Sequence, residues 1–392
     1  MGEVNVSPDF DIVMGRLDDV SKTLSANAEE SEELGRLTDE SARALIDSGV
    51  LRVCIPKELG GYEFSPRQLI QTIEKISYAD ASAGWAFMAL QMVTGTTAAY
   101  LGEEAAAELF PDVAHGEHAL IAGQGTRLGI ATKVDGGYLV SGSWQFASGS
   151  SMATHIHTAG FCEETGEALI FTFPVEQTTL IDNWDVMGLR ATSSNDYNLD
   201  NLFVPDAFTY QVTISDPVYG GALYKMGLAN MSGIAHTGWA LGVGRRMLDE
   251  MRTLAVKKSS APHASVNTQQ FYAEYAEAEA ALRSARAWVM EVWADNEATL
   301  DRGEPLSVEQ QTMTRLMLNN TTWSVHALGQ TVYKWAATAA LRRGVLQRFF
   351  RDLHAGTQHM SSGPVVLQNT GKWLAGLAPN SRWQYFDLVD AR

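Results

Sequence analysis

Hydrophobic positions recur with helical spacing through the first third of the chain. Between Glu29 and Ser48 the apolar residues form a stripe along one helical face, which predicts an amphipathic helix. The residues that form this stripe are Leu34, Leu37, Ala42, Leu45 and Ile46. The stretch from Pro66 to Ser77 repeats the spacing and predicts a second helix. We expect a non-helical connector between the two, because Pro56 and the Gly60-Gly61 pair interrupt the apolar run there.

Near the middle of the chain the pattern changes to strict alternation. Residues 136–149 read G-G-Y-L-V-S-G-S-W-Q-F-A-S-G, and the leading glycine pair supplies a tight turn, so the stretch predicts a hairpin strand. The alternation places Trp144, Phe146 and Ser148 on one face, where two aromatic rings and a hydroxyl group would line a planar ligand such as a flavin. The other interpretation is a half-buried strand whose aromatic residues belong to the core.

Further short alternating runs extend from residue 118 to about residue 210, and they predict a small antiparallel barrel or sandwich. Helical spacing returns after Tyr224. It marks four long stripes, at residues 226–252, 269–300, 307–340 and from 344 onward, as expected for a bundle of antiparallel helices. We therefore expect an α+β fold with a helical domain at residues 1–117, a central β domain at 118–222 and a C-terminal helical bundle at 223–392.

Composition narrows the classes of function. Of the 392 residues, 45% are hydrophobic and 19% are charged, which is typical of globular domains. The net charge of −17 argues against a nucleic-acid partner, because phosphate backbones are bound by clustered Lys and Arg. The stretch from Gly84 to Leu101 approaches membrane-spanning length, but Gln91 and a cluster of Thr residues within it favour a buried helix over a membrane segment.

The cysteines and the N-terminus predict a cytoplasmic protein. Cys54 and Cys162 are the only cysteines, and neither stands in a Cys-x-x-Cys or Cys/His cluster, so we expect reduced thiols and no bound metal. The N-terminal stretch M-G-E-V-N-V-S-P-D-F-D lacks the basic and apolar regions of a secretory signal. The loop G-Q-G-T-R-L-G at residues 123–129 is not followed by a long helix, so it does not predict a dinucleotide site.

Four stretches, in their order along the chain, carry a resemblance to one protein family. They are I-P-K-E-L-G-G-Y with A-D-A-S-A-G-W (residues 55–62 and 79–85), S-G-S-W-Q-F-A-S-G (141–149), W-D-V-M-G-L-R-A-T-S-S-N-D with F-V-P (184–196 and 203–205), and L-Q-R-F-F-R-D-L-H-A-G-T-Q-H (346–359). The chain resembles the acyl-CoA dehydrogenase fold and, more narrowly, the two-component flavin-dependent monooxygenases, which include 4-hydroxyphenylacetate hydroxylase, steroid-ring hydroxylases and dibenzothiophene monooxygenase.

The resemblance implies the oxygenase component of such a system. It would receive reduced FMN or FAD from a separate flavin reductase and use dioxygen, through a C4a-hydroperoxyflavin, to hydroxylate an aromatic, phenolic or indolic small molecule. The alternatives are an acyl-CoA dehydrogenase-type flavin oxidoreductase, an N-oxygenase acting on an amino group such as that of an amino sugar, and a scaffold without enzymatic activity. The resemblance also implies a homotetramer. We expect its contacts on apolar residues of the C-terminal helices, namely Leu316, Trp323, Leu328, Val332 and Trp335.

The choice between dehydrogenase and monooxygenase depends on a catalytic base. Acyl-CoA dehydrogenases commonly carry a glutamate shortly after the Arg-Asp pair, whereas here L-H-A-G-T-Q-H-M-S-S-G-P follows Asp352 without a carboxylate. His359 stands in this segment, matches the monooxygenase-like pattern R-[DN]-x-x-x-x-x-x-H, and would share a face with Arg348 and Asp352 if the segment were helical. An imidazole of ordinary pKa, about 6.5, suits a base that takes a proton from a phenol. The other interpretation is a buried histidine bonded to a carbonyl group.

Ser148 is expected to fill the second catalytic role, a hydrogen bond that keeps the oxygenated flavin from losing hydrogen peroxide. Its alternative is a strand-end hydroxyl that satisfies a backbone group. The resemblance assigns further flavin contacts to Gln124, Gly125, Thr126, Trp144, Phe146, Ala147, Thr192 and Ser194. Lys258 stands about where dehydrogenase relatives carry an arginine for the flavin phosphate, and a solvated surface lysine is its alternative. The usual family segment G-L-R-G-T-G-S is G-L-R-A-T-S-S here, so two glycines and their close backbone approach are lost.

Overall fold

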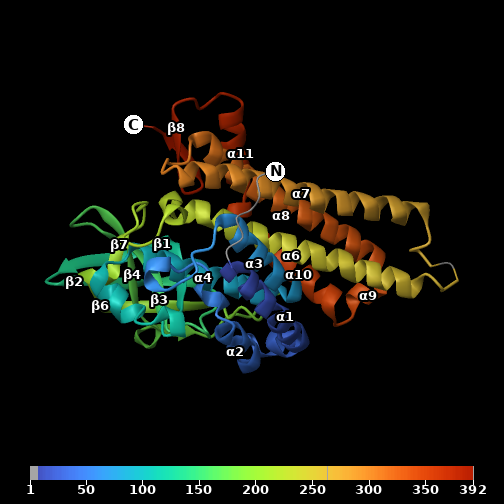
Figure 1. The fold of residues 1–392 in the computed structure, drawn as a ribbon, viewed down its shortest axis with the longest axis horizontal. Helices are drawn as coiled ribbons and strands as arrows, with labels where there is room; N and C mark the ends of the chain where they lie inside the picture. The colour runs from blue at the N-terminus through green and yellow to red at the C-terminus, as the bar shows by residue number, and fades with distance from the viewer. Residues whose placement is uncertain (1–7, 263, 392) are drawn as a thin grey trace. The chain divides into compact units, whose positions relative to one another are not determined.

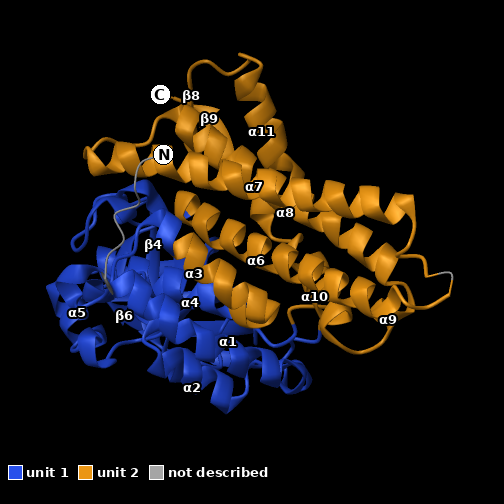
Figure 2. Cartoon of the chain, turned by 45° about the vertical axis from the view of Figure 1, so that its right-hand side comes forward, with its two compact units in different colours: residues 1–68, 85–185, 190–228 blue, residues 69–84, 186–189, 229–392 orange. Residues whose placement is uncertain are grey.

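The computed structural model describes residues 8–262 and 264–391, in the helix, sheet, helix order that the sequence predicts (Figure 1). The predicted α+β fold class is confirmed. The chain divides into two compact units (Figure 2). Unit 1 comprises residues 1–68, 85–185 and 190–228, and unit 2 comprises residues 69–84, 186–189 and 229–392. The three-domain division stays a prediction. The prediction that the N-terminal stretch is not a secretory signal falls mostly on residues 1–7, which lie outside the described residues.

The helices of unit 1 differ from the sequence pattern at one point. They are α1 (Pro8–Leu34), α2 (Asp39–Asp47), the part of α4 (Ala81–Tyr100) that begins at Trp85, and α5 (Glu103–Leu109). The single helix expected over residues 29–48 is wrong, because Gly35 adopts a left-handed φ of 68° and Thr38 then caps a new helix by accepting a hydrogen bond from the Ser41 amide. Leu34 and Ile46 of the expected apolar stripe are exposed as a result.

A seven-stranded sheet forms the rest of unit 1. Its strands are β1 (Ile121–Val134), β2 (Gly137–Ala147), β3 (His155–Cys162), β4 (Glu167–Pro174), β5 (Thr179–Ile181), β6 (Asn195–Pro205) and β7 (Thr209–Gln211). Their spatial order is β5-β6-β2-β1-β3-β4-β7, and only the β1–β3 pair is parallel. The hairpin predicted from the alternating pattern joins β1 to β2. Val134 pairs with Gly137 across it, and Gly136 takes a φ of 74° that glycine reaches without steric cost.

Unit 2 contains the long helices. It holds α3 (Pro66–Ala79) from Leu69 onward, most of α6 (Gly227–Lys258), α7 (Gln269–Asp301), α8 (Val308–Ala336), α9 (Thr338–Leu341), α10 (Val345–Gly356), α11 (Pro364–Leu374) and a hairpin of β8 (Ser381–Gln384) and β9 (Asp387–Asp390). The α8 helix begins with a capping box in which Ser307 and Gln310 each bond to the other's backbone amide. It ends at Ala336, so the stripe expected over residues 307–340 is divided between two helices.

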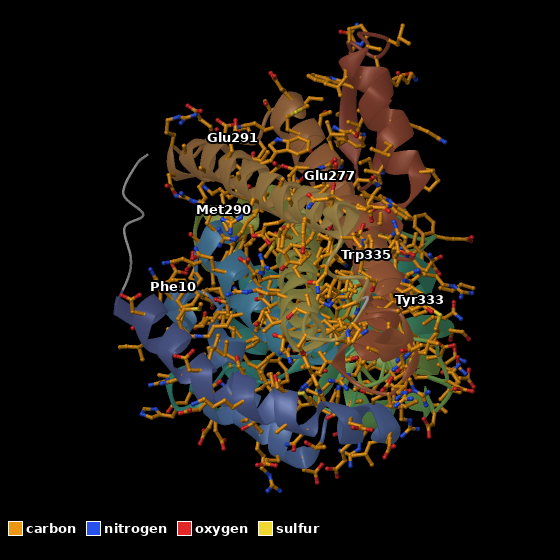
Figure 3. The ribbon with its side chains drawn as sticks, turned by 90° about the vertical axis from the view of Figure 1, so that its right-hand side faces the viewer. Phe10, Glu277, Met290, Glu291, Tyr333 and Trp335 are labelled. Carbon is orange, nitrogen blue, oxygen red and sulfur yellow. The ribbon has the colours of Figure 1, made fainter. Side chains whose placement is uncertain are left out.

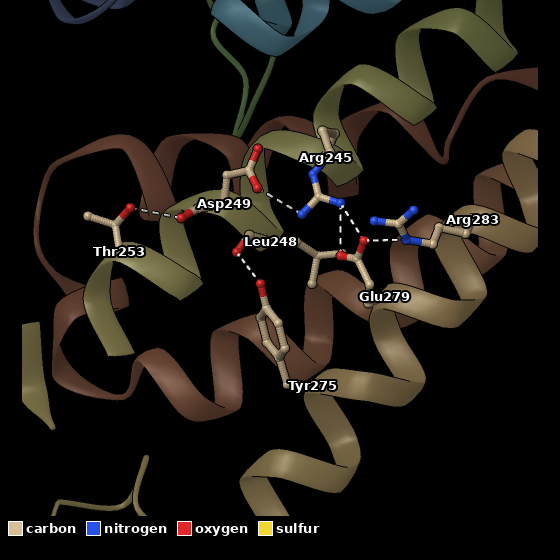
Figure 4. A network of polar contacts seen from close by, with 7 residues as sticks. All are labelled: Arg245, Leu248, Asp249, Thr253, Tyr275, Glu279 and Arg283. Carbon is tan, nitrogen blue, oxygen red and sulfur yellow. Dashed lines mark hydrogen bonds and ion pairs between the residues drawn. The ribbon is translucent and has the colours of Figure 1, made fainter. Parts of the chain in front are cut away.

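Polar contacts tie α6 to α7 within unit 2 (Figure 4). Arg245 donates to both carboxylate oxygens of Glu279, at 2.8 and 3.0 Å, and to Asp249 at 2.8 Å. Arg283 donates to Glu279 at 2.7 Å, and the Tyr275 hydroxyl donates to the Leu248 carbonyl at 3.0 Å. The guanidinium group of Arg245 is planar and contacts two carboxylates. Its hydrogen bonds therefore fix the position of α6 against α7, in addition to the attraction between the charges.

The surface of α7 carries part of the protein's acidic charge. Glu277 and Glu291 are exposed on this helix (Figure 3). Trp335 of α8 donates to Glu274 at 2.7 Å.

Two of the residues that we expected at a subunit contact, Leu328 and Val332, are buried inside unit 2, so these two assignments are wrong. They lie on the inner face of α8 because its register directs them into the bundle.

The apolar stretch at residues 84–101 forms most of α4, whose side chains pack inside the protein. Phe87 and Leu90 are completely buried. Across residues 8–262 and 264–391, none of the helices combines the length and the apolar character that a membrane crossing requires. The prediction of a buried helix in preference to a membrane segment is therefore confirmed.

Candidate active site

A β-bulge near the end of β2 decides where the aromatic residues of this strand point. Trp144 pairs with Tyr197 and Ala147 pairs with Asn195, so three steps along β2 match two steps along β6. The extra residue puts Phe146 at a left-handed φ of 67° and shifts the alternation beyond it. Trp144 is completely buried, whereas Phe146 is 59% exposed. The shared face predicted for Trp144, Phe146 and Ser148 is therefore not formed.

Trp144 and Phe146 consequently have different surroundings. The Trp144 ring stacks on Tyr197 with centroids 5.5 Å apart, and its Nε1 donates to the carbonyls of Arg127 and Ala159. This arrangement agrees with the interpretation that Trp144 belongs to the core. Phe146 meets Trp184 edge to face, with centroids 6.1 Å apart, and so presents an exposed aromatic surface in unit 1.

Ser148 lies at the start of a chain of hydroxyl groups. Its Oγ is 2.8 Å from Ser194 Oγ, which in turn is 2.6 Å from Thr192 Oγ1. The indole Nε1 of Trp85 donates to Ser148 Oγ at 3.3 Å. The structure thus brings together Ser148, Thr192 and Ser194, three of the residues predicted from the sequence, and adds Trp85.

This chain leaves Ser148 with hydrogen-bonding capacity for a ligand. A hydroxyl group can donate once and accept twice, and an indole N–H can only donate. If Ser148 donates to Ser194, it accepts from Trp85 and keeps one lone pair for a ligand N–H. If Ser194 donates to Ser148, the Ser148 hydroxyl keeps its own proton for a ligand acceptor. Rotation of the hydroxyl groups therefore converts Ser148 between an acceptor and a donor.

The backbone around Ser148 is held by the segment that contains Thr192. The Gly149 amide donates to the Thr192 carbonyl at 2.8 Å, and the Ser150 hydroxyl donates to the Ser193 carbonyl at 2.7 Å. Ser193, which replaces a glycine of the family pattern, has a φ of 42°, and its hydroxyl accepts from the Ser151 amide at 3.1 Å. This side chain therefore compensates locally for a backbone conformation that favours glycine.

The predicted contacts Gln124, Gly125 and Thr126 lie at an irregularity in the sheet. The β1–β3 register is broken between Gln124 and Leu128. Gln124 Oε1 accepts hydrogen bonds from the Thr126 amide at 2.8 Å and from the Thr126 hydroxyl at 2.6 Å, which closes a compact loop. Thr126 is exposed at the tip of this loop. Gln124 shapes the loop, and Thr126 and the neighbouring peptide groups are the parts that a ligand can reach.

Lys258, the predicted phosphate contact, is the last residue of α6. Its Nζ donates to the carbonyl of Ala336 at 3.0 Å, and Ala336 ends α8. A cation at a helix C-terminus interacts favourably with the helix dipole, which gives this lysine a role within unit 2. A lysine ammonium has three donors, so this bond does not use its full capacity.

His359 belongs to unit 2 and lies beyond the end of α10. The helix ends at Gly356, where a Cβ atom would lie 2.2 Å from the Trp239 ring. The chain turns there, and His359 caps the next short helix, Met360–Ser362. The helical face predicted to join His359 to Arg348 and Asp352 is therefore wrong.

A second histidine stacks on His359. The ring of His236, from α6, lies with its centroid 4.0 Å from that of His359 at an interplanar angle of 28°. The Nδ1 of His236 faces the Ser232 carbonyl at 2.9 Å, and the Nδ1 of His359 lies 2.8 Å from the Ser361 hydroxyl. The Ser361 amide donates to His359 Nδ1 at 3.3 Å, so Nδ1 is an acceptor and the neutral ring carries its proton on Nε2. His359 as a whole is partly buried.

Burial keeps both imidazoles neutral. It lowers the pKa of His236 to about 4, and burial together with the nearby His236 lowers the pKa of His359 well below its ordinary value. Both rings are therefore unprotonated at neutral pH. The ordinary pKa that we expected for His359 is therefore wrong, because burial and the stacked His236 lower it, which keeps the ring neutral and also makes it a weaker base.

The Arg-Asp pair of the sequence motif holds the backbone of the segment at residues 186–189. Asp352 Oδ1 accepts from the Leu189 amide at 2.6 Å, and Arg351 donates to the Met187 carbonyl at 2.8 Å. Leu189 has a φ of 57°. These two hydrogen bonds hold the segment at residues 186–189 against α10 within unit 2.

Comparisons with known proteins agree with this architecture. Residues 18–117 match the family model for the acyl-CoA dehydrogenase N-terminal domain, and residues 234–363 match the model for the acyl-CoA dehydrogenase C-terminal domain. The crystal structure of 3-HSA hydroxylase from Rhodococcus sp. RHA1 has a TM-score of 0.86 and 27% identity to this chain, and the match covers 93% of this chain and 96% of the other.

Two relatives decide the branch of the fold. Indole-3-acetate monooxygenase from Pseudomonas putida is 29% identical over 360 residues, 86% of this chain and 88% of the relative. The flavin-dependent monooxygenase oxygenase subunit HsaA from Rhodococcus jostii (strain RHA1) is 27% identical over 377 residues, 92% of this chain and 98% of the relative. The chain belongs to the flavin-dependent monooxygenases of the acyl-CoA dehydrogenase fold. This monooxygenase is an enzyme whose cofactor is a flavin, FMN or FAD.

The residues around Ser148 in this monooxygenase fit a flavin. A flavin ring edge offers both N–H and acceptor groups, and the hydroxyl chain from Ser148 to Thr192 can answer either kind. Exposed Phe146 offers an apolar surface, and the loop at Thr126 offers a hydroxyl and peptide groups outside the regular ladder. These hydroxyl and peptide groups are uncharged and can donate or accept hydrogen bonds, which suits a ring that carries both donors and acceptors.

Two residues of the monooxygenase were not predicted from the sequence. Trp85 stands in the A-D-A-S-A-G-W stretch that carries the family resemblance, and this motif was the available signal. His236 occupies an otherwise apolar and small-residue stretch of α6, where nothing in the sequence distinguishes it from a core histidine. Its pairing with His359 is a tertiary contact.

We expect the folded monooxygenase to lose stability as the pH falls from about 6.5 towards 4. Burial lowers the pKa of His157 and of His236 to about 4. Between these pH values the unfolded chain binds protons at both histidines and the folded chain does not, so unfolding is favoured by roughly 1–2 kcal/mol per histidine at pH 5. Urea unfolding midpoints at pH 7.5 and pH 5 measure the effect.

The matched variants for this measurement are His236→Asn and His115→Asn. The first removes one buried imidazole and should flatten the pH dependence, whereas exposed His115 should not affect it. Equal midpoints at the two pH values in the parent protein would contradict the loss of stability expected from His157 and His236.

Proposed function

We propose that this protein is the oxygenase component of a two-component system and hydroxylates a small aromatic, phenolic or indolic molecule. A separate reductase would supply the reduced flavin, and the bound flavin would supply the activated oxygen. The relatives support this class, since they include an indole-3-acetate monooxygenase and the oxygenase component of an FADH(2)-dependent resorcinol hydroxylase.

The observation that carries the proposal is the stacked pair of neutral imidazoles. A base for a phenol or an indole N–H must be unprotonated near pH 7 and able to reach the substrate. His359 meets the first requirement, because its pKa is held low, and the residue is only partly buried. The Ser361 amide donates to Nδ1 and so orients the ring. We assign His359 the role of general base and His236 a positioning role.

Ser148 is proposed to bind the flavin ring edge. Trp85 and Ser194 fix its hydroxyl from two sides, and Thr192 extends the chain. This network lets Ser148 accept from a ligand N–H or donate to a ligand nitrogen without movement of the backbone. The roles proposed for Gln124, Gly125 and Thr126 are to form the loop beside the flavin, and Lys258 is proposed to approach its phosphate. Trp144 and Ala147 would support the strand from the core, and Phe146 would pack against the ring.

The direct test supplies chemically reduced FMN or FAD and air to the purified protein, together with a panel of phenols and indoles. Incorporation of ¹⁸O from labelled dioxygen into a hydroxylated product is the expected result. An equal yield of product without protein would remove the proposal, as would a protein that binds reduced flavin but yields only hydrogen peroxide across all members of the panel and its amine controls.

The same assay separates the two alternatives. An N-oxygenase would transfer ¹⁸O to an amino group of an amine or amino sugar and not to an aromatic ring. A dehydrogenase would bleach oxidised flavin when an acyl-CoA is added without dioxygen. The segment after Asp352, L-H-A-G-T-Q-H-M-S-S-G-P, contains no carboxylate. This argues against the dehydrogenase, because acyl-CoA dehydrogenases commonly use a glutamate there as the catalytic base.

We further propose a homotetramer whose contacts use α11 and the turn after it. Val365, Leu367 and Leu374 of α11 are 48%, 43% and 51% exposed, and Leu377 is 72% exposed. Exposed apolar groups at this density mark an interface. Light scattering of the parent protein at micromolar concentration should give four chains. The variant Leu367→Glu/Leu377→Glu should give a smaller assembly, whereas Ile12→Glu, at an exposed apolar position of α1, should not. A monomeric parent protein would refute the proposal.

A further inference from the structure

Two histidines on neighbouring helices of unit 2 point their Nε2 atoms toward each other. His326 lies on α8 and His354 lies on α10, and their Nε2 atoms are 3.3 Å apart. The side-chain amide of Gln330, one turn after His326, lies 3.3 Å from His326 Nε2 and 3.0 Å from His354 Nε2. These three groups converge outside the residues assigned to the flavin and the substrate.

The lone pair of His354 points into this cluster. Its Nδ1 lies 2.9 Å from the carbonyl of Phe350, one turn earlier on α10, so Nδ1 carries the proton in the neutral ring. The Nε2 atom then has only a lone pair to offer. An Nδ1–H bond to a backbone carbonyl is the usual outer partner of a metal-binding histidine, because it fixes the tautomer and the ring orientation.

The separation of the two nitrogens matches a shared metal ion. Zinc binds histidine nitrogen at about 2.0–2.1 Å, and two such ligands in tetrahedral geometry lie about 3.3–3.4 Å apart. The oxygen and nitrogen of a Gln amide exchange places by a rotation of the terminal group, so Gln330 can present its oxygen as a third ligand. We propose that His326, His354 and Gln330 form a binding site for one divalent transition-metal ion of the Zn²⁺, Cu²⁺ and Ni²⁺ class.

The surroundings favour this class of ion. The Trp323 ring meets His326 edge to face at 5.3 Å, and Phe350 lies 4.3 Å from His354, so aromatic contacts hold both imidazoles. Gln330 is exposed, and water can complete the coordination on its side. Imidazole ligands without a carboxylate suit Zn²⁺, Cu²⁺ and Ni²⁺ and do not suit Mg²⁺ or Ca²⁺.

The expectation of no bound metal was based on the two cysteines, and the proposed site does not use them. In residues 8–262 and 264–391, no group of three or more His, Cys, Asp or Glu side chains is placed to hold a metal ion. The proposed site uses two histidines and an amide, and its histidines are 28 residues apart in sequence. A metal ion at this point would connect α8 directly to α10.

Titration of the protein without an affinity tag tests the site. We expect isothermal titration calorimetry with Zn²⁺ to show one equivalent per chain, and Mg²⁺ to show no binding at the same concentration. Co²⁺ should give visible d–d absorption, and Cu²⁺ should give an electron paramagnetic resonance spectrum with coupling to two nitrogens. The thermal unfolding midpoint should rise with Zn²⁺, since an ion that binds only the folded state stabilises it.

Variants distinguish this site from scattered surface histidines. His326→Ala and His354→Ala should each weaken Zn²⁺ binding by more than about tenfold, whereas His115→Ala should not change it. Gln330→His places a third imidazole one helical turn from His326 and should tighten binding. Metal binding should release protons and weaken as the solution is acidified, because a metal ion competes with protons for its ligands.

Two results would overturn the proposal. One is a parent protein that shows no saturable Zn²⁺ binding up to millimolar concentration while circular dichroism shows it folded. The other is Zn²⁺ binding that persists unchanged in the folded His326→Ala and His354→Ala variants, since the ion would then occupy another place. A gain of affinity in Gln330→His together with its loss in His354→Ala would support the assignment to this cluster.

Discussion

Replacement of His359 by alanine is expected to lower the rate of substrate hydroxylation by about a hundred- to ten-thousandfold. The reason is the loss of an unprotonated imidazole that takes the substrate proton, while the hydroxyl network around Ser148, on other elements, remains. Reduced-flavin binding and oxygen consumption should persist, so the flavin should be reoxidised with release of hydrogen peroxide. Product formation and peroxide release are measured in parallel under air with reduced flavin supplied.

A graded set of variants makes this prediction specific. His115→Ala changes an exposed histidine and should leave hydroxylation unchanged. His236→Gln should act through the pKa of His359, because His236 helps to hold that pKa low. The His359 pKa should then rise, and the acid limb of the pH–rate profile should move to higher pH. A His359→Ala enzyme that hydroxylates at the parent rate would remove His359 from the mechanism, and an unmoved pH profile in His236→Gln would remove the positioning role.

Replacement of Ser148 by alanine is expected to raise the ratio of hydrogen peroxide to hydroxylated product by about tenfold, which corresponds to the loss of one well-placed hydrogen bond of about 1.4 kcal/mol. Trp85 and Ser194 would then face a methyl group. The peroxide should increase even in the absence of substrate, which separates this variant from His359→Ala. Stopped-flow reoxidation of reduced flavin, with peroxide quantified at the end, provides the measurement.

Matched controls exist along the same strand and network. Ser143→Ala, at an exposed position of β2, should behave like the parent protein. Ser194→Ala should show a smaller increase in peroxide than Ser148→Ala, because it removes the partner of Ser148 and leaves the Ser148 hydroxyl itself. Equal peroxide yields in Ser148→Ala and the parent protein, with flavin binding retained, would show that Ser148 serves only the strand end.

Some of the sequence predictions are confirmed and others are wrong, because some depend only on short local patterns and others on a pattern continuing over a longer stretch. The hairpin turn at Gly136 and the long helices follow from local periodicity and turn chemistry, and both are present. The helix expected over residues 29–48 fails at Gly35, and the helical face through His359 fails at Gly356. Gly35 ends its helix in a left-handed conformation, whereas Gly356 is the last residue of α10 and packs against the Trp239 ring.

The candidate site divides in the same way. Local motifs identified Ser148, Thr192, Ser194 and His359 as candidates, and the structure brings the first three into one hydroxyl chain. Their roles, and that of His359, stay predictions. The orientation of Trp144 was mispredicted because one extra residue in β2 reverses the alternation, and strand periodicity carries no record of a bulge.

By itself, the sequence determined the fold class, the family resemblance and the absence of a carboxylate after Asp352, since these depend on residue identity and short-range order. Only the tertiary structure decided which distant side chains meet. Trp85 reaches Ser148 across 63 positions, His236 stacks on His359, and His326 meets His354 from another helix. Such pairings arise because side chains at the contact of two packed elements are set by the register and crossing of those elements, and neither quantity is encoded in the periodicity of either one alone.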